Sequence, residues 1–257
     1  MNINDAKNIT NKLLKTFLEA GNLSLELRKK GLKKEIKKDN TPVTNADLKI
    51  DNILVNKINK ITPEIPIISE ETSNNKELKN LNNFWLIDPI DGTYDYINNR
   101  EEFTLNAALI INKIPMIGII NAPAKNRLFY TYAKDHSYEL KNNKEIILNC
   151  EKKTKKNQII AVSYSNELNP IIKEFHKKIG VTEYVKMKSS LKFCVIASGE
   201  YDAYVAEPRA NEWDIAARHA ILKNAGGIIL DFEGKEILYG KKNFKNTSII
   251  LKRSENL

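Results

Sequence analysis

The segment Asp88–Thr93 constrains this 257-residue chain more than any other, because six residues combine two carboxylates, a proline, a glycine and a hydroxyl. It directly follows the apolar run Phe84–Ile87, which is typical of a buried strand. Proline fixes the backbone and glycine permits a close approach, so the two carboxylates, the Ile90 carbonyl and the amides beyond it can converge on one point. The sequence therefore predicts a site for a hard cation or a phosphate group at the end of this strand.

Composition narrows the class of partner. Hydrophobic residues make up 42% of the chain, which fits a globular core, and the formal net charge is +9, which suits anionic partners. The lysine runs, for example Lys152-Lys153 and Lys241-Lys242, lack the interleaved aromatic residues of a single-strand binding groove, so we interpret them as solvated faces. We therefore expect a small anionic, phosphorylated substrate and no stable nucleic-acid partner.

Cysteine usage and the N-terminal residues predict the location. Cys150 and Cys194 form neither a disulfide framework nor a metal-thiolate spacing, which favours a reducing compartment. The first residues lack the basic start and apolar core of a signal peptide, and no run approaches the roughly 18 apolar residues of a membrane span. We expect a cytoplasmic protein without a transmembrane segment, with peripheral attachment to the inner face of the membrane as the alternative.

The spacing of apolar residues predicts the elements of the first half of the chain. Helical spacing extends over Asn4–Lys30, and over Asn45–Ile61 with Thr44 as its cap. Several apolar runs predict strands, and the later ones suit an antiparallel meander. These runs are Ile65–Ile68, Phe84–Ile87, Phe103–Asn112, Ile114–Asn121, Leu128–Ala133 and Ser137–Leu140.

The pattern changes in the second half, where predicted strands and helices alternate. The strands cover 159–163, 181–185, 203–205 and 228–231, and the helices cover 170–179, 190–198 and 213–224. We expect an N-terminal α+β half, residues 1–150, that carries the metal-binding motifs. A C-terminal α/β half, residues 151–257, would contribute Asp214 and the residues that select the substrate, with the seam in Glu151–Asn157.

Carboxylates stand at the ends of four predicted elements. Asp47 lies early in a helix, Glu70 follows a strand, Asp88 and Asp91 flank a turn, and Asp214 begins a helix. Each one alone fits a purely structural role, since acids complement a helix N-terminus and favour turns. Brought together, they would raise one another's pKa unless a cation neutralised them. Mg²⁺ suits this position, because it takes oxygen ligands and keeps waters that leave room for a phosphate.

The neighbouring residues suit the hydrolysis of a phosphate ester. Paired metal ions activate a water and stabilise the leaving oxygen of an in-line displacement. The Thr93 hydroxyl is placed to pass a proton from that water to Asp47. The amides of Gly92 and Thr93 can hold phosphate oxygens.

Three segments carry a resemblance to a known family: Ile68–Glu71, Trp85–Thr93, and Trp213–Ala217 followed by Ala225–Gly227. In order and spacing they resemble the signatures of the Mg²⁺-dependent, lithium-sensitive phosphatases of the inositol monophosphatase superfamily. The resemblance implies a layered αβαβα sandwich, a mixed α+β or α/β fold, and usually a homodimer. It also implies two or three Mg²⁺ ions held by Glu70, Asp88, the Ile90 carbonyl, Asp91 and Asp214, with Asp47, Thr93 and Glu70 as catalytic residues.

Within that superfamily the chain most resembles the bacterial 3'(2'),5'-bisphosphate nucleotidases, which implies conversion of 3'-phosphoadenosine 5'-phosphate to AMP and phosphate. The segment Ser189–Cys194 is the most telling, and Lys192 is expected to meet a second phosphate. Glu207 lies seven residues before Asp214, where inositol phosphatases place a glutamate, so inositol 1-phosphate or another sugar phosphate is the alternative substrate. The substrate-binding residues expected from the resemblance are Gly92, Thr93, Ser190, Lys192, Glu207 and Asp214.

The residues expected to select the substrate also fit purely structural roles. Lys192 can be an exposed helix lysine, Glu207 can pair with Arg209, and Ser190 can be a helix cap. A remote alternative, suggested by the +9 charge, is an inactive RNA-binding or regulatory protein of the same fold. The presence of every expected metal ligand favours the hydrolase.

Overall fold

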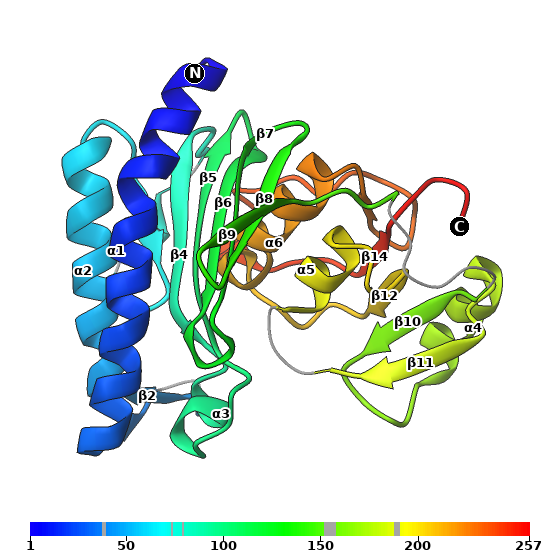
Figure 1. Cartoon of the computed structure of the whole chain (residues 1–257), viewed down its shortest axis with the longest axis horizontal. Helices are drawn as coiled ribbons and strands as arrows, with labels where there is room; N and C mark the ends of the chain where they lie inside the picture. Colours follow the sequence, from blue (N-terminus) through cyan, green and yellow to red (C-terminus); the bar gives the residue numbers. More distant parts are fainter. Residues whose placement is uncertain (38–39, 73, 79, 152–157, 188–190) are drawn as a thin grey trace.

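The computed structural model of the chain consists of five layers in the order αβαβα, built on two large sheets (Figure 1). It describes residues 1–257 apart from 38–39, 73, 79, 152–157 and 188–190. The layer order is the one that the resemblance implied, and the fold prediction is confirmed. None of the helices within these described ranges is both long and apolar enough to cross a membrane.

The first layer is a pair of helices, α1 (Ile3–Lys30) and α2 (Asn45–Ile61), which lie side by side against one face of the larger sheet (Figure 1). Thr44 caps α2 and forms a capping box with Asp47. The apolar stripes of both helices are buried with one face of the sheet in a continuous core. Both helices were predicted from periodicity, and both predictions are confirmed.

The second layer is a seven-stranded sheet in the order β3-β4-β5-β6-β7-β8-β9. Helices cover both of its faces, and β4 is accordingly buried along almost its whole length. The strands β4 to β9 form an antiparallel meander, of which β5 to β8 were predicted, whereas β3 runs parallel to β4. Its strands are β3 (Ile67–Ser69), β4 (Phe84–Asp91), β5 (Thr104–Ile111), β6 (Ile114–Ala122), β7 (Arg127–Ala133), β8 (His136–Lys141) and β9 (Lys144–Ile147).

The third layer is formed by α5 (Leu191–Ala197) and α6 (Glu212–Asn224), which lie between the two sheets (Figure 1). Ten of the thirteen residues of α6 are buried, because α6 packs on strands of the larger sheet and on the smaller sheet. A second large core joins these helices to both sheets. Consequently, the N-terminus of α6 lies close to the ends of strands far away in the sequence.

The last two layers are a five-stranded sheet, in the order β11-β10-β12-β14-β13, and the outer helix α4 (Pro170–Ile179). Asn169 caps α4, and Gly180 ends it in the left-handed conformation. The parallel pairs β10-β11 and β10-β12 follow from the alternation of strands and helices in this part of the sequence. Its strands are β10 (Ile160–Ser163), β11 (Glu183–Lys186), β12 (Ala203–Ala206), β13 (Ile228–Leu230) and β14 (Ile249–Lys252).

Some short elements were not predicted, because three to five residues carry too little periodicity to be recognised. These are the strand pair β1 (Lys34–Ile36) and β2 (Pro42–Thr44), the helix α3 (Thr93–Ile97), the strands β9 and β14, and the 3₁₀ turns Asn74–Glu77, Pro123–Lys125 and Lys242–Phe244. The predicted strand Phe84–Ile87 also continues to Asp91, with an irregular register between Asp88 and Asp91. Most of the predicted seam, Glu151–Asn157, lies outside the described residues, and the division into halves 1–150 and 151–257 stays a prediction.

Candidate active site

Three carboxylates from distant parts of the chain meet at one end of the larger sheet. Oxygen atoms of Glu70, Asp88 and Asp214 all lie within 4.8 Å of one another. Glu70 directly follows β3, and its amide donates to the carbonyl of Ile87 at 3.0 Å, which holds it beside Asp88 on the parallel neighbour β4. Asp214 reaches the same point from the first turn of α6. The predicted convergence of these three residues is thus found in the structure.

Asp88 is the most deeply buried member of this carboxylate cluster, with 1% of its surface exposed. Neither side-chain oxygen has a hydrogen-bond partner among the described residues. Burial, followed by the charges of Glu70, Asp91 and Asp214, raises its pKa well above the usual range. An orphaned buried carboxylate beside two others is a set of hard oxygen donors, and this observation fits a divalent cation such as Mg²⁺.

Asp214 combines a structural and an electrostatic position. Its Oδ2 accepts a hydrogen bond from the amide of Asn211 at 2.6 Å, which closes the capping box of α6. Burial, together with the negative charges of Asp91 and Glu70, raises the pKa of its carboxyl to about 7. The helix start therefore explains where Asp214 lies, while its neighbours explain why it is a candidate ligand.

Asp91 lies beside the carboxylate cluster but has a different partner. Its Oδ2 accepts a hydrogen bond from Nη2 of Arg218 at 2.7 Å. The irregularity between Asp88 and Asp91 turns this part of β4 out of regular register, and the carbonyl of Ile90 lies 3.1 Å from the Thr93 hydroxyl. The predicted roles of Ile90 and Asp91 as metal ligands stay predictions.

Thr93 and Asp47 form the pair that was predicted to move a proton. The Thr93 hydroxyl lies 3.1 Å from Oδ1 of Asp47, and the Thr44 amide donates to the other oxygen of Asp47 at 2.8 Å. Burial raises the pKa of Asp47, although the hydrogen bonds from Thr44 and Thr93 oppose the rise. The helix cap of α2 thus fixes the carboxylate that faces the Thr93 hydroxyl.

Gly92 is required by the backbone at this turn. Its φ of +86° lies in the left-handed region, and a Cβ atom would lie 2.8 Å from the Glu102 carbonyl oxygen. A side chain would therefore be strained and would also collide with the backbone. The predicted role of the amides of residues 92 and 93 in holding a phosphate stays a prediction.

Two lysines next to the carboxylate cluster were not predicted. Nζ of Lys37 lies 2.9 Å from an oxygen of Glu70 and 2.7 Å from one of Glu71, and Nζ of Lys76 donates to the Glu70 carbonyl. Burial raises the pKa of Glu71 to about 7, against the hydrogen bond from Lys37. Both lysines lie in short segments without periodicity, so the sequence offered no signal for them.

Arg218 was also missed, although a signal existed. It lies four residues after Asp214, and residues at this spacing share a face of a helix. A basic residue on the same face as a predicted ligand could have been recognised as a neighbour of the site.

The predicted substrate residues are only partly described. Ser190 lies outside the described residues. Lys192 is not an exposed helix lysine: it is 4% exposed, with its ammonium 5.5 Å from the ring centre of Tyr204, and burial followed by the charge of Arg218 lowers its pKa to about 7. Glu207 is exposed and accepts a hydrogen bond from Asn169, whereas Arg209 lies over the Tyr164 ring at 3.6 Å.

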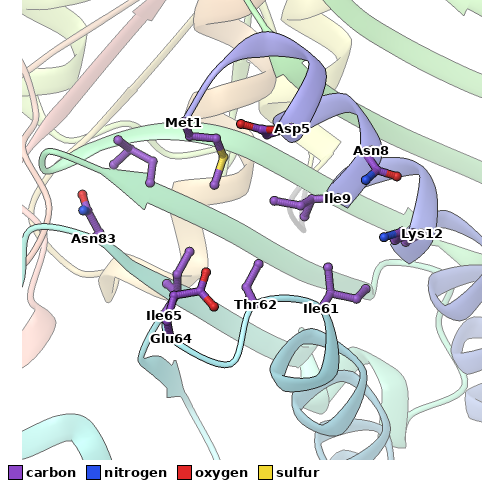
Figure 2. Close-up of a pocket in the computed structure, with 11 residues that line it drawn as sticks. Met1, Asp5, Asn8, Ile9, Lys12, Ile61, Thr62, Glu64, Ile65 and Asn83 are labelled. Carbon is purple, nitrogen blue, oxygen red and sulfur yellow. The ribbon is translucent and has the colours of Figure 1, made fainter.

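An open depression of about 540 Å³ lies away from the carboxylate cluster, between the start of α1 and the end of α2 (Figure 2). Asp5, Lys12 and Glu64 are its charged residues, and apolar side chains such as Ile9 line the rest. No member of the carboxylate cluster borders it. This depression is therefore not the candidate active site.

Comparison with known proteins agrees with this geometry. The sequence pattern of the inositol monophosphatase family matches residues 5–256. The 3'(2'),5'-bisphosphate nucleotidase CysQ of Buchnera aphidicola subsp. Acyrthosiphon pisum is 37% identical over 204 residues, which cover 79% of this chain and 76% of that protein. The protein of the same name from Escherichia coli strain K12 is 32% identical over 204 residues, with coverage of 79% and 81%. A solved structure, CysQ from Bacteroides thetaiotaomicron, is 26% identical with a TM-score of 0.76 and covers 96% of this chain and 97% of that one.

Proposed function

The chain belongs to the inositol monophosphatase family, and from this premise we propose that it is a Mg²⁺-dependent 3'(2'),5'-bisphosphate nucleotidase. It would convert 3'-phosphoadenosine 5'-phosphate to AMP and phosphate. The observation that carries the proposal is the meeting of Glu70, Asp88 and Asp214, with both oxygens of Asp88 lacking a hydrogen-bond partner among the described residues.

The carboxylate cluster would hold the metal. Glu70, Asp88 and Asp214 offer the hard oxygens that Mg²⁺ prefers, and Asp91 and the carbonyl of Ile90 are the predicted further ligands. When bound, Mg²⁺ neutralises these carboxylates, lowers the pKa of a water and stabilises the negative charge on phosphate oxygens. We propose that two or three ions bind, as the resemblance implies.

The residues of the chain then provide the proton path. The Thr93 hydroxyl accepts a proton from the attacking water and passes its own to Asp47, whose oxygen lies 3.1 Å away. The water oxygen adds to phosphorus, and the bond from phosphorus to the ribose 3' oxygen breaks. The ribose oxygen takes a proton from a solvent water and Asp47 returns its proton to solvent, so that AMP and inorganic phosphate are the products. The amides of Gly92 and Thr93 hold the phosphate in line for this attack.

The selection of the substrate is assigned to the second half of the chain, where Lys192 is buried next to Tyr204. We propose that Lys192 meets the second phosphate of the substrate, since a lysine ammonium is a common binder of phosphate groups. The proposed division of labour places the proton path in residues 1–150 and Lys192 and Asp214 in residues 151–257. A homodimer and a cytoplasmic location are the corresponding predictions for assembly and location.

The decisive experiment is a substrate panel with and without Mg²⁺. Phosphate release should be fastest with 3'-phosphoadenosine 5'-phosphate, slower with inositol 1-phosphate, and absent after chelation of the metal. Asp214→Asn and Asp91→Asn should abolish turnover while the circular dichroism spectrum stays native. Near-normal turnover by either variant would contradict the assignment, and RNA binding without any phosphatase activity would favour the regulatory alternative.

A further inference from the structure

Arg218 places a permanent positive charge at the candidate metal site. The residue lies on α6, one helical turn after Asp214, and 6% of its surface is exposed. Nη2 donates to Oδ2 of Asp91 at 2.7 Å, and the side chains of this ion pair are 8% and 20% exposed. A guanidinium keeps its charge at every pH at which the protein is folded, so this cation cannot be removed by titration.

Asp91 lies close to the carboxylate cluster, since its charge helps to raise the pKa of Asp88 and Asp214, but it is not one of the three clustered residues. The group whose oxygens lie mutually within 4.8 Å consists of Glu70, Asp88 and Asp214 and does not include Asp91. One oxygen of Asp91 is already bound by the guanidinium. A divalent ion that used this oxygen would have to displace Arg218 or accept a positive charge next to it.

The guanidinium is buried between α6 and α5. Its central carbon lies 5.7 Å from the ring centre of Phe193 on α5, and its Nε is buried without a hydrogen-bond partner among the described residues. Lys37, the cation that pairs with Glu70, is more exposed: 21% of its side chain is exposed, against 8% for Arg218. It also lies on the short segment between β1 and β2 and not on a helix. Arg218 is therefore the fixed cation of the two, anchored on a buried helix.

We propose that Arg218 is a resident cation of the metal centre, which occupies Asp91 and weakens the binding of a divalent ion there. The tight ion is then held by Glu70, Asp88 and Asp214, and any further ion binds weakly. The guanidinium supplies at Asp91 the positive charge that a metal ion would otherwise supply. The inference rests on the proposed function for the identity of the metal, but it concerns this chain's own arginine and is tested by binding alone.

The test is to count bound Mn²⁺ by electron paramagnetic resonance and to measure Mg²⁺ binding by calorimetry for the wild type and Arg218→Met. We expect the variant to bind the weaker ion about tenfold more tightly or better, as Coulomb's law gives for single and double positive charges roughly 5 Å apart, even at the dielectric constant of water. Arg218→Lys, which keeps the charge, should stay close to the wild type. An unchanged number of ions and unchanged affinities in Arg218→Met would overturn the inference.

Arg253→Met is the matched control, because Arg253 also forms a buried ion pair with an aspartate, Asp202, but that aspartate is not a member of the carboxylate cluster. Its metal binding should equal that of the wild type, and an equal gain in both methionine variants would overturn the inference.

A second variant keeps the inference testable if Arg218→Met does not fold. Asp91→Asn should weaken the first, tight ion less than Asp88→Asn does, because the first variant removes a nearby charge and the second removes a ligand of that ion. A loss of the tight ion in Asp91→Asn would overturn the inference. Phosphate release is measured separately, so a protein without phosphatase activity but with the expected metal binding would refute the proposed function alone.

Discussion

Asp214→Asn should stabilise the protein when metal is absent and destabilise it, relative to the wild type, when Mg²⁺ is present. Burial and the charges of Asp91 and Glu70 raise the pKa of Asp214 from its ordinary value of 3.8 to about 7 in the folded state. The folded state therefore binds this proton more tightly than the unfolded state. Its contribution to stability is present in full below pH 3.8 and is lost as the pH rises to about 7.

The effect on the free energy of unfolding follows from the pKa shift of Asp214. At about 1.4 kcal/mol for each pH unit, ionisation of Asp214 costs at most about 4 kcal/mol of folding free energy in the metal-free protein. Asparagine cannot ionise, but it accepts the Asn211 hydrogen bond less strongly, which costs about 1 kcal/mol. The variant should therefore be more stable by roughly 2–3 kcal/mol above pH 7, and its melting temperature should be higher by about 4–12 °C.

Mg²⁺ should reverse this order. At a thousandfold excess over Kd, a bound ion adds about 4.1 kcal/mol to the stability of the wild type, which exceeds the roughly 2–3 kcal/mol by which the variant leads without metal. Asp214→Asn lacks one of the three clustered carboxylates and should gain far less. Thermal melts of the wild type and of Asp214→Asn, each in a chelator and in Mg²⁺, test this order. Repeating the melts below and above neutral pH tests whether ionisation of Asp214 causes it.

The matched control is Asp5→Asn, because Asp5 occupies the same third position in the capping box of α1 but is exposed. Its small loss of stability should not depend on metal. A wild type that is more stable than Asp214→Asn in the chelator above neutral pH would refute the electrostatic reasoning, since the cap would then outweigh the buried charge.

Two further variants test the turn after β4 and the proton path. Gly92→Ala should destabilise the protein by more than Gly234→Ala, measured by urea unfolding, because both glycines have positive φ (+86° and +79°) but only the Cβ at position 92 would meet a backbone atom, at 2.8 Å. Equal losses would show that the close contact with Glu102 is relieved without cost. Thr93→Ala should lower kcat by about 10²–10⁴-fold with little change in KM, while Thr93→Ser should keep most of the activity. Equal rates in the alanine and serine variants would exclude the hydroxyl from proton transfer.

The long elements could be predicted because each has one clear period of burial. Residues 45–61 of α2 were predicted to the residue, since Thr44 marks the start and the apolar stripe continues to the end of the helix. The meander from β5 to β8 was predicted within one residue at every strand end. Short elements such as α3 escaped, because their conformation is imposed by the residues around them, here by the left-handed Gly92 at the helix start.

The carboxylates of the site could be predicted for a different reason. Glu70 follows β3 and Asp214 lies in the first turn of α6, and element ends are visible in a sequence, whereas Asp88 lies within β4 and was recognised from the proline and glycine that follow it. The lysines that face them were not predicted, because a lysine among forty-one lysines and arginines carries no distinguishing pattern. Lys37 becomes significant only when the strand pair β1-β2 places it beside Glu70.

The carboxylates and the cations beside them together explain how the site is stable before a metal binds. Three carboxylates at one point repel one another, and the raised pKa values of Asp88 and Asp214, which arise from burial first and from this repulsion second, are one response. The ion pairs of Lys37 with Glu70 and of Arg218 with Asp91 are the other. A metal ion releases the protons and competes with the two cations, so the affinity of the site is set in part by groups that are not metal ligands. A sequence that keeps every ligand but changes these cations would keep the fold and change the concentration of Mg²⁺ at which the enzyme works.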